Sequence, residues 1–316
     1  MADLQKFTCV KDIYNLSQAL QECIEIKKNP LATPDVGKGK TVGLIFLNPS
    51  LRTRISMQKA CQNLGFNSIV INAGQDAWTW ELEEGMVMNG VGVEHIKDAA
   101  KVLSEYCDVI AIRCFPYLKN REEDAQDRIL NQFIKYASVP IISLESTTRH
   151  PLQSFADMLT IKENWLESRR PKVVLTWAPH IKPIAHSVAN SFCEWIKEID
   201  AEVVVACPEG YDLDPQYTQG LMITHKQAEA LKGADFIYVK NWSSFHLYGA
   251  TPEVDEDWQL TADKLRESPT AKIMHCLPVR RNVEIDDEVL DSENALIYKQ
   301  AANRLVTAQW VLKNIV

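Results

Sequence analysis

Several features that define common protein classes are missing from this 316-residue chain. No run of apolar residues approaches the ~18 that a membrane-spanning helix needs, and the N-terminal stretch MADLQKFTCVKD lacks the apolar core of a signal peptide. The formal net charge of −8 argues against a general attraction to nucleic acid or anionic lipid. The sequence therefore predicts a cytoplasmic globular protein that binds neither nucleic acid nor membranes.

Metal and nucleotide motifs are also missing. The eight cysteines form no CxxC pair, and the seven histidines show no HExxH or other ligand spacing. We therefore expect reduced cysteines, no metal and no organic cofactor. The absence of a glycine-rich Walker pattern makes a nucleoside triphosphate a poor candidate ligand.

Short β-rich segments alternate with amphipathic helical segments along the chain. Helical periodicity marks residues 94–106 and 128–137, and in the first of these the apolar stripe consists of Ile96, Ala99, Ala100, Leu103 and Tyr106. Apolar runs predict strands at 41–47, 68–72, 108–112, 139–143, 172–177, 202–207, 235–240 and 272–277. This alternation predicts an α/β protein of two domains, each a mostly parallel sheet with helices on both faces.

The boundary between the two domains is indicated by a change in composition. The polar segment ESRRPK follows a strongly helical stretch and precedes a new series of strands, which predicts a hinge near residues 148–168. We expect a first domain of residues 1–150 and a second of 151–299. The last helical stretch, 300–316, is followed by no strand; it could pack on either domain, and we assign it to the first.

Hydroxyl and cationic residues follow the first predicted strand, in the segment NPSLRTRIS. Ser50, Leu51, Arg52, Thr53 and Arg54 stand where a helix begins, so free backbone N–H groups and the helix dipole favour an anion there. Arginines add bidentate, charge-assisted bonds, for which phosphate is a good partner. A capped helix with two solvated arginines is the alternative that composition alone would favour.

Three further segments contain candidate site residues. AIRCF places Arg113 at a strand end, TTRHPLQSF places His150 and Gln153 on one face of a first helical turn, and MHCLPVRRN places Cys276 at another strand end. The alternatives are that His150 is a structural helix cap and that Cys276 is a buried thiol before a loop.

Together the SxRTR, HPxQ and HCLP segments and the strand-end arginine resemble the aspartate/ornithine carbamoyltransferase family, and the resemblance covers essentially the whole chain. It implies one domain for carbamoyl phosphate, one for an amine substrate, and a trimer whose neighbouring subunits share active sites. It also implies that catalysis involves Arg113, His150, Gln153 and Cys276. The residues implied to bind carbamoyl phosphate are Ser50, Leu51, Arg52, Thr53, Arg54, Trp78, Arg113, His150, Gln153, Leu277 and Arg304.

The second half of the chain is more similar to the N-acylornithine branch of this family than to its ornithine-specific members. Lys240 stands where ornithine-specific members carry an aspartate that pairs with the free α-ammonium group, and NWSSF replaces their SMG loop. A lysine there favours an acylated α-nitrogen; a solvated lysine at a strand end is the alternative. The loop QDAWTWELEEGMVMNG also resembles that branch, in which Trp78 would reach a neighbouring subunit's site instead of packing in a core.

The resemblance implies a set of acylornithine contacts, namely Val93, Glu145, His180, Lys182, Lys240, Cys276, Leu277 and Arg280. Val93 stands where acetyl-accepting relatives carry a glutamate, whose charge would repel a succinyl carboxylate; packing of Val93 beneath the next helix is the alternative. We therefore expect carbamoyl transfer to the δ-amine of N-succinyl-L-ornithine, giving N-succinyl-L-citrulline and phosphate in arginine biosynthesis. Transfer to N-acetyl-L-ornithine, and a non-catalytic phosphometabolite sensor, are the competing hypotheses.

Overall fold

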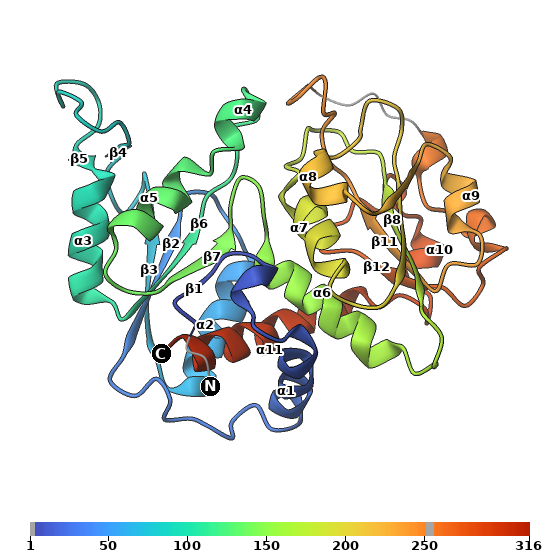
Figure 1. The fold of residues 1–316 in the computed structure, drawn as a ribbon, viewed down its shortest axis with the longest axis horizontal. Coiled ribbons are helices and arrows are strands. Elements are labelled where there is room, and N and C mark those ends of the chain that lie inside the picture. Colours follow the sequence, from blue (N-terminus) through green and yellow to red (C-terminus); the bar gives the residue numbers. More distant parts are fainter. Residues whose placement is uncertain (1–3, 251–255) are drawn as a thin grey trace. The chain divides into compact units, whose positions relative to one another are not determined.

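Two compact units make up the chain in the computed structural model, which describes residues 4–250 and 256–316 (Figure 1). The first unit comprises Met1–Tyr117, Glu122–Leu152 and Arg304–Val316, and the second comprises Leu118–Arg121 and Gln153–Asn303. Three helices contribute residues to both units, namely α4 (Arg121–Asp124), α6 (Pro151–Asn164) and α11 (Ile297–Ile315).

The first unit contains a parallel sheet in the order β1-β7-β6-β2-β3. The chain passes from β2 to β3 on one side and then to β6 on the other, so the strand order reverses between β2 and β6. In such sheets ligands bind outside the carboxyl ends of the strands at the reversal point. The strands are β1 (Lys6–Phe7), β2 (Thr41–Phe46), β3 (Asn67–Asn72), β6 (Val109–Arg113) and β7 (Ile141–Glu145), and a separate pair is formed by β4 (Trp80–Glu81) and β5 (Glu94–His95).

Helices cover both faces of this sheet (Figure 1). On one face, α3 (Ile96–Tyr106) and α5 (Arg128–Tyr136) pack against apolar side chains of β2, β6 and β7. On the other, α2 (Arg52–Leu64) is joined to the unit's part of α11 by a buried bond of 3.0 Å from Asn63 Nδ2 to Gln309 Oε1. Trp310 of α11 in turn donates to Glu22 of α1 (Leu16–Lys28) at 2.7 Å.

The second unit contains a parallel sheet in the order β10-β9-β8-β11-β12, which reverses between β8 and β11. Figure 1 shows α7 (Ser187–Ile196) and α8 (Pro215–Thr218) on one face, and α9 (Gln227–Leu231) and α10 (Asp287–Leu290) on the other. The strands are β8 (Lys172–Trp177), β9 (Glu202–Ala206), β10 (Met222–Thr224), β11 (Phe236–Lys240) and β12 (Lys272–Met274). Short 3-10 helices lie at Val10–Asp12, Glu256–Trp258 and Asp263–Leu265.

The two parallel sheets with flanking helices confirm the α/β class, and each of the eight predicted strands is present. The prediction for 272–277 is three residues too long. The strand stops at Met274 because the His275 N–H donates to Gln300 Oε1 at 2.9 Å instead of to a neighbouring strand. Tyr106, placed on the apolar stripe of α3, is 68% exposed, and α11 begins at Ile297, before the expected start.

Two further observations concern membranes and thiols. In residues 4–250 and 256–316, no helix is both long and apolar enough to cross a bilayer. In the part of the chain that the structure describes, none of the eight cysteines is in a disulfide; Cys9 and Cys276 are half-buried and the others are buried.

We expect Phe133→Ala to lower the free energy of unfolding by about 3–5 kcal/mol, because the change leaves a cavity in a core cluster. Phe133 is fully buried on α5 and meets the Trp80 ring edge-on at a centroid distance of 5.4 Å. Tyr106→Ala on α3 is the control and should change the value by less than about 0.5 kcal/mol. Urea unfolding measures both, and equal effects would contradict this description of the core.

Candidate active site

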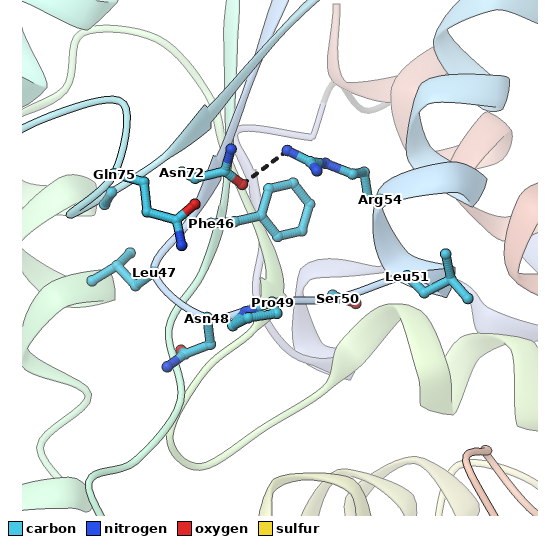
Figure 2. Close-up of a pocket in the computed structure, with 10 residues that line it drawn as sticks. Phe46, Leu47, Asn48, Pro49, Ser50, Leu51, Arg54, Asn72 and Gln75 are labelled. Atoms are coloured by element: carbon cyan, nitrogen blue, oxygen red, sulfur yellow. Dashed lines mark hydrogen bonds between the residues drawn. The ribbon is translucent and has the colours of Figure 1, made fainter.

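The turn that follows β2 lines a hollow of about 400 Å³ in the first unit (Figure 2). Leu51 occupies the position before α2, and its side chain gives no capping hydrogen bond. The first N–H groups of α2 can therefore receive an anion. The residues that line the hollow are Phe46, Leu47, Asn48, Pro49, Ser50, Leu51, Arg54, Asn72, Ala73 and Gln75.

Arg54 is fixed at the wall of this hollow. Its Nη2 donates to Asn72 Oδ1 at 2.8 Å, as the dashed line in Figure 2 shows, and its guanidinium lies over the Phe46 ring at 5.4 Å from the centroid. Asn72 is itself held by Asp76, whose carboxylate accepts from both the backbone and side-chain nitrogens of Asn72. The alternative of a freely solvated arginine is therefore wrong for Arg54.

Arg113, at the end of β6, connects the turn to the neighbouring strand. Its Nη1 donates to the carbonyls of Asn48 at 3.1 Å and Pro49 at 3.0 Å, while Nη2 donates to Glu145 Oε2 at 3.0 Å. The guanidinium lies 4.0 Å from the centroid of the Phe115 ring, and Arg113 as a whole is 6% exposed. Because a buried charge is costly unless it is paired and hydrogen-bonded, these contacts determine where Arg113 lies.

Arg304, in the part of α11 that belongs to the first unit, donates from Nη2 to Thr53 Oγ1 at 2.7 Å. Both side chains are buried. This bond joins the first turn of α2 to a residue 251 positions later in the chain. The first unit thus contains the SxRTR segment, the strand-end arginine Arg113 and Arg304, all of which the sequence analysis singled out.

His150 is a neutral imidazole within this cationic cluster. Burial lowers its pKa well below the usual value, and the charges of Arg304, Arg113 and Arg52 lower it further. Its Nε2 lies 3.7 Å from Glu145 Oε2, and its Nδ1 is buried with no hydrogen-bond partner among the residues that the structure describes. A neutral histidine can donate one N–H to a ligand without adding a positive charge.

Glu145, which the resemblance implies to contact the acylornithine, lies among the cationic residues of the first unit. It ends β7 in the first unit, is 4% exposed, and directs Oε2 at both Arg113 and His150. Its contacts are those of a counter-ion for Arg113. Its contact with the acylornithine stays a prediction.

A second polar cluster lies in the second unit, at its own strand-order reversal. His180 follows β8, Lys240 ends β11, and Arg280 follows β12. Arg280 Nε donates to His180 Nε2 at 3.2 Å, and His180 Nδ1 lies 2.9 Å from the carbonyl oxygen and 3.1 Å from the backbone nitrogen of Lys182. Burial lowers the pKa of His180, and the charges of Lys240 and Arg280 add to this effect.

The centre of this second cluster is Glu284, which the sequence analysis missed. It is 2% exposed and accepts from the Arg280 backbone N–H at 2.6 Å. Burial alone would raise its pKa, but the hydrogen bond and charge of His275 and the charge of Lys240 keep that pKa below its usual value. The spacing of four residues after Arg280 was the one available signal, and it is too common to have been specific.

Lys240 and Lys182 differ in their surroundings. Lys240 is 7% exposed and donates from Nζ to the Asn241 carbonyl at 2.7 Å, so the alternative of a solvated lysine is wrong. Lys182 is exposed. Cys276 is half-buried, and the next residue, Leu277, has a positive φ of 58° and donates its N–H to His275 Nδ1 at 2.9 Å.

The loop around β4 and β5 exposes several of its large apolar side chains. Trp78 is 54% exposed and donates from Nε1 to Glu94 Oε2 at 2.9 Å. Val93 is 64% exposed, with its N–H bonded to the Thr79 carbonyl. The alternatives of a core tryptophan and of a valine packed beneath α3 are therefore wrong. In the first unit, Asn72 and Gln75 are further pocket residues that the sequence analysis missed.

Among the described residues, one group could hold a metal ion, namely Cys207, Asp212 and His225 in the second unit. Ordinary contacts account for it: His225 Nδ1 bonds the Cys207 carbonyl at 2.9 Å, and its Nε2 lies 3.7 Å from Asp212 Oδ1. Burial raises the pKa of the Cys207 thiol, which opposes the thiolate that a metal would require. We assign no metal to this group.

The electrostatics of His150 give a testable pH dependence. Because its folded-state pKa lies below 6.5, its contribution to stability is fully present above about pH 6.5 and is lost as the pH falls further. We expect the His150 ring signal in proton NMR, assigned by its loss in His150→Gln, to show no titration between about pH 8 and about pH 6. A midpoint near the usual histidine value would contradict the buried cationic cluster.

Comparison with known proteins identifies the family of the chain. Residues 5–163 match the family model "Aspartate/ornithine carbamoyltransferase, carbamoyl-P binding domain", and residues 184–315 match "Aspartate/ornithine carbamoyltransferase, Asp/Orn binding domain". The N-succinylornithine carbamoyltransferase of Bacteroides fragilis is 45% identical over 99% of this chain and 98% of its own length. The N-acetylornithine carbamoyltransferase of Xylella fastidiosa is 35% identical over 95% of this chain and 94% of its own.

A solved structure adds a comparison with bound ligands. It is a glutamate-to-valine variant of N-acetyl-L-ornithine transcarbamylase, complexed with carbamyl phosphate and N-succinyl-L-norvaline. It has a TM-score of 0.92 and 32% sequence identity to this chain, covering 98% of this chain and 99% of the other. Both family models, the full-length relatives and this structure agree with the motifs in the sequence: the chain belongs to the aspartate/ornithine carbamoyltransferase family.

Proposed function

We propose that the protein transfers the carbamoyl group of carbamoyl phosphate to the δ-amine of N-succinyl-L-ornithine, giving N-succinyl-L-citrulline and phosphate, a step of arginine biosynthesis. The observation that carries this proposal is the set of arginines in the first unit around an unprotonated, buried His150. Such a cluster of buried positive charge is suited to a small dianion. The family model for this part of the chain is described as a carbamoyl-P binding domain.

In the proposed reaction, the first unit binds carbamoyl phosphate and stabilises the charges that develop as it reacts. The first N–H groups of α2, with Ser50, Thr53 and Arg54, bind the departing phosphate. Arg113 and His150 donate to the carbonyl oxygen, on which negative charge accumulates when the neutral amine attacks the carbamoyl carbon. Preorganised donors of this kind stabilise a transition state because they need no reorientation during the reaction. The residues require no metal for these steps.

The second unit, in this proposal, binds the acylated amino acid. Lys240 and Arg280 provide positive charge for its carboxylate groups, and both contribute to the low pKa of His180. A cationic cluster here disfavours the free α-ammonium of ornithine and tolerates an acylated, uncharged α-nitrogen. Cys276 and the Leu277 carbonyl complete this part of the proposed site.

Two comparisons favour a succinyl group over an acetyl group. The N-succinylornithine enzyme of Bacteroides fragilis is more similar to this chain than the Xylella fastidiosa N-acetylornithine enzyme is, at 45% against 35% identity. In the solved variant, an acetylornithine enzyme whose glutamate is replaced by valine is complexed with N-succinyl-L-norvaline. We propose that Val93 corresponds to that substituted position, so that no glutamate charge opposes the succinyl carboxylate.

The exposed loop around β4 and β5 supports a shared site in an oligomer. Trp78 and Val93 are more than half exposed in the single chain, and Met86, Val87 and Val91 of the same loop are exposed as well. Contiguous exposed apolar side chains are typical of interaction surfaces. We propose a cytoplasmic homotrimer in which this loop extends into the active site of a neighbouring subunit.

Arg54→Ala should reduce kcat/KM for carbamoyl phosphate by about a thousandfold or more, because it removes a charge-assisted phosphate contact that strengthens in the transition state. Lys59→Ala, which removes an exposed positive charge from the same helix, is the matched control. Steady-state kinetics of both variants make the comparison. An Arg54→Ala enzyme within about threefold of the parent would refute the phosphate assignment.

The acyl preference is tested by kcat/KM for N-succinyl-L-ornithine, N-acetyl-L-ornithine and L-ornithine. We expect that order in the parent, and we expect Val93→Glu to lower the value for the succinyl compound by about tenfold or more while sparing the acetyl compound. Val102→Glu adds the same charge to an exposed valine of α3, outside this loop, and it should leave the preference unchanged. A parent that prefers the acetyl compound would overturn the choice of acyl group and leave the reaction class intact.

A further inference from the structure

Asp127 stands directly before α5 in the first unit, at a position where an aspartate ordinarily caps the helix. A capping carboxylate accepts from backbone N–H groups of the first helical turn, yet the side chain of Asp127 gives α5 no such bond. The backbone of Asp127 is left-handed, with φ 46° and ψ 40°, a conformation that costs free energy in a residue with a Cβ. A residue held in this way without capping its own helix indicates that its side chain serves another segment.

The carboxylate of Asp127 faces the turn that leads from β7 to α6. Oδ1 accepts from the backbone N–H of Thr147 at 2.8 Å, and the Thr147 hydroxyl contacts the same oxygen. Oδ2 accepts from the Ser146 hydroxyl at 3.1 Å and from the Thr148 hydroxyl. Three consecutive residues of the first unit therefore bind one buried carboxylate, and His150 follows them just before α6 begins.

The Ser146 hydroxyl links this carboxylate to the backbone of the turn. Its Oγ accepts from the N–H groups of Thr148 at 3.3 Å and Arg149 at 3.1 Å. The Ser146 N–H in turn donates to the Arg149 carbonyl at 2.7 Å. A hydroxyl has two acceptor sites and one proton. Because both acceptor sites are filled, the Ser146 proton must go to Asp127 Oδ2, and only an acceptor can occupy that position.

The position of the His150 ring depends on the backbone that carries it. The ring is buried, and its Nδ1 has no hydrogen-bond partner within the described ranges 4–250 and 256–316. A buried imidazole with an unsatisfied nitrogen would gain free energy by turning toward water. The charged groups around it are Glu145 of β7, Arg113 of β6, Arg52 of α2 and Arg304 of α11.

We infer that Asp127 is a positioning residue, whose carboxylate sets the 146–148 turn and thereby holds the His150 ring among the arginines of the first unit. The catalytic consequence rests on the proposed function, in which His150 donates to the carbonyl oxygen of carbamoyl phosphate. The position of the ring does not depend on which reaction the protein catalyses. Asp127 therefore acts on the reaction through His150 and contacts no substrate itself.

Asp127→Asn tests this inference with almost no change in shape, because neither orientation of the asparagine amide fits the turn. An NH2 toward Ser146 meets an oxygen whose acceptor sites are filled, and an NH2 toward Thr147 meets a backbone N–H, which can only donate. We expect His150 to leave the cluster. Its ring signal in proton NMR, which should not titrate between about pH 8 and about pH 6 in the parent, should then titrate with a midpoint of about 6.5.

The direction of this change separates position from charge. Loss of a negative charge alone would lower the pKa of His150 further, whereas release of the ring into water would raise that pKa toward its usual value. Asp12→Asn is the matched control, because Asp12 of the first unit likewise accepts from one hydroxyl and two backbone N–H groups of a turn. It should leave the His150 signal as it is in the parent.

Steady-state kinetics give an independent readout. Asp127→Asn should lower kcat by about a hundredfold, because a misplaced His150 no longer donates in the transition state. In a His150→Gln background, the same substitution should lower kcat no further, because it acts through His150. A general loss of structure would lower kcat in both backgrounds.

Each outcome bears on the inference. A folded Asp127→Asn protein whose His150 signal does not titrate, or an equal change in Asp12→Asn, would overturn it. If Asp127→Asn does not fold, Ser146→Ala decides, since it removes the hydroxyl that joins the carboxylate to two backbone N–H groups: we expect His150 to titrate, and a signal like the parent's contradicts the inference. Because NMR needs no turnover, a protein that shows these titrations but transfers no carbamoyl group would refute the proposed function alone.

Discussion

The buried guanidinium of Arg113 is the contact on which the site of the first unit depends. It joins three segments that are distant in the sequence: β6, the Asn48–Pro49 turn whose carbonyls it binds, and β7, where Glu145 balances its charge. A buried charge is stable only when such partners are in place. Fixing the guanidinium therefore also fixes the turn, and the turn determines where α2 begins and where its first N–H groups point. The parallel sheet contributes by ending β2 and β6 side by side at the strand-order reversal.

Each unit places an electrically neutral histidine among positive charges. In the first unit burial and three arginines lower the pKa of His150; in the second, burial with Lys240 and Arg280 lowers that of His180. A neutral imidazole donates or accepts hydrogen bonds without adding to the repulsion between neighbouring cations. Each unit also has an almost fully buried carboxylate: Glu145 pairs with the Arg113 guanidinium, and Glu284 accepts from the backbone N–H of Arg280. The proposed chemistry follows from this charge distribution, which favours anionic groups in both units.

Sequence patterns predicted the elements whose signal is local. The long central strands were found because both of their faces are buried and their apolar runs are continuous, whereas β1 and β10 are two or three residues long and were missed. The motif residues after β2 and at the start of α6 were found because their neighbours in the sequence are also their neighbours in space. Glu284 and Asn72 were missed because polar residues four positions apart, such as Arg280 and Glu284 or Asn72 and Asp76, are too common in sequences to mark a site.

The central claim is that this protein transfers a carbamoyl group, and following the carbon atom itself tests it most directly. Carbamoyl phosphate labelled with ¹³C at the carbonyl carbon would be incubated with the protein and N-succinyl-L-ornithine, and carbon NMR would follow the label. We predict that the label appears as the ureido carbon of N-succinyl-L-citrulline, with one phosphate released for each ureido group formed. Binding of carbamoyl phosphate without formation of a ureido product from any of the three amines would contradict the claim and indicate a phosphometabolite sensor.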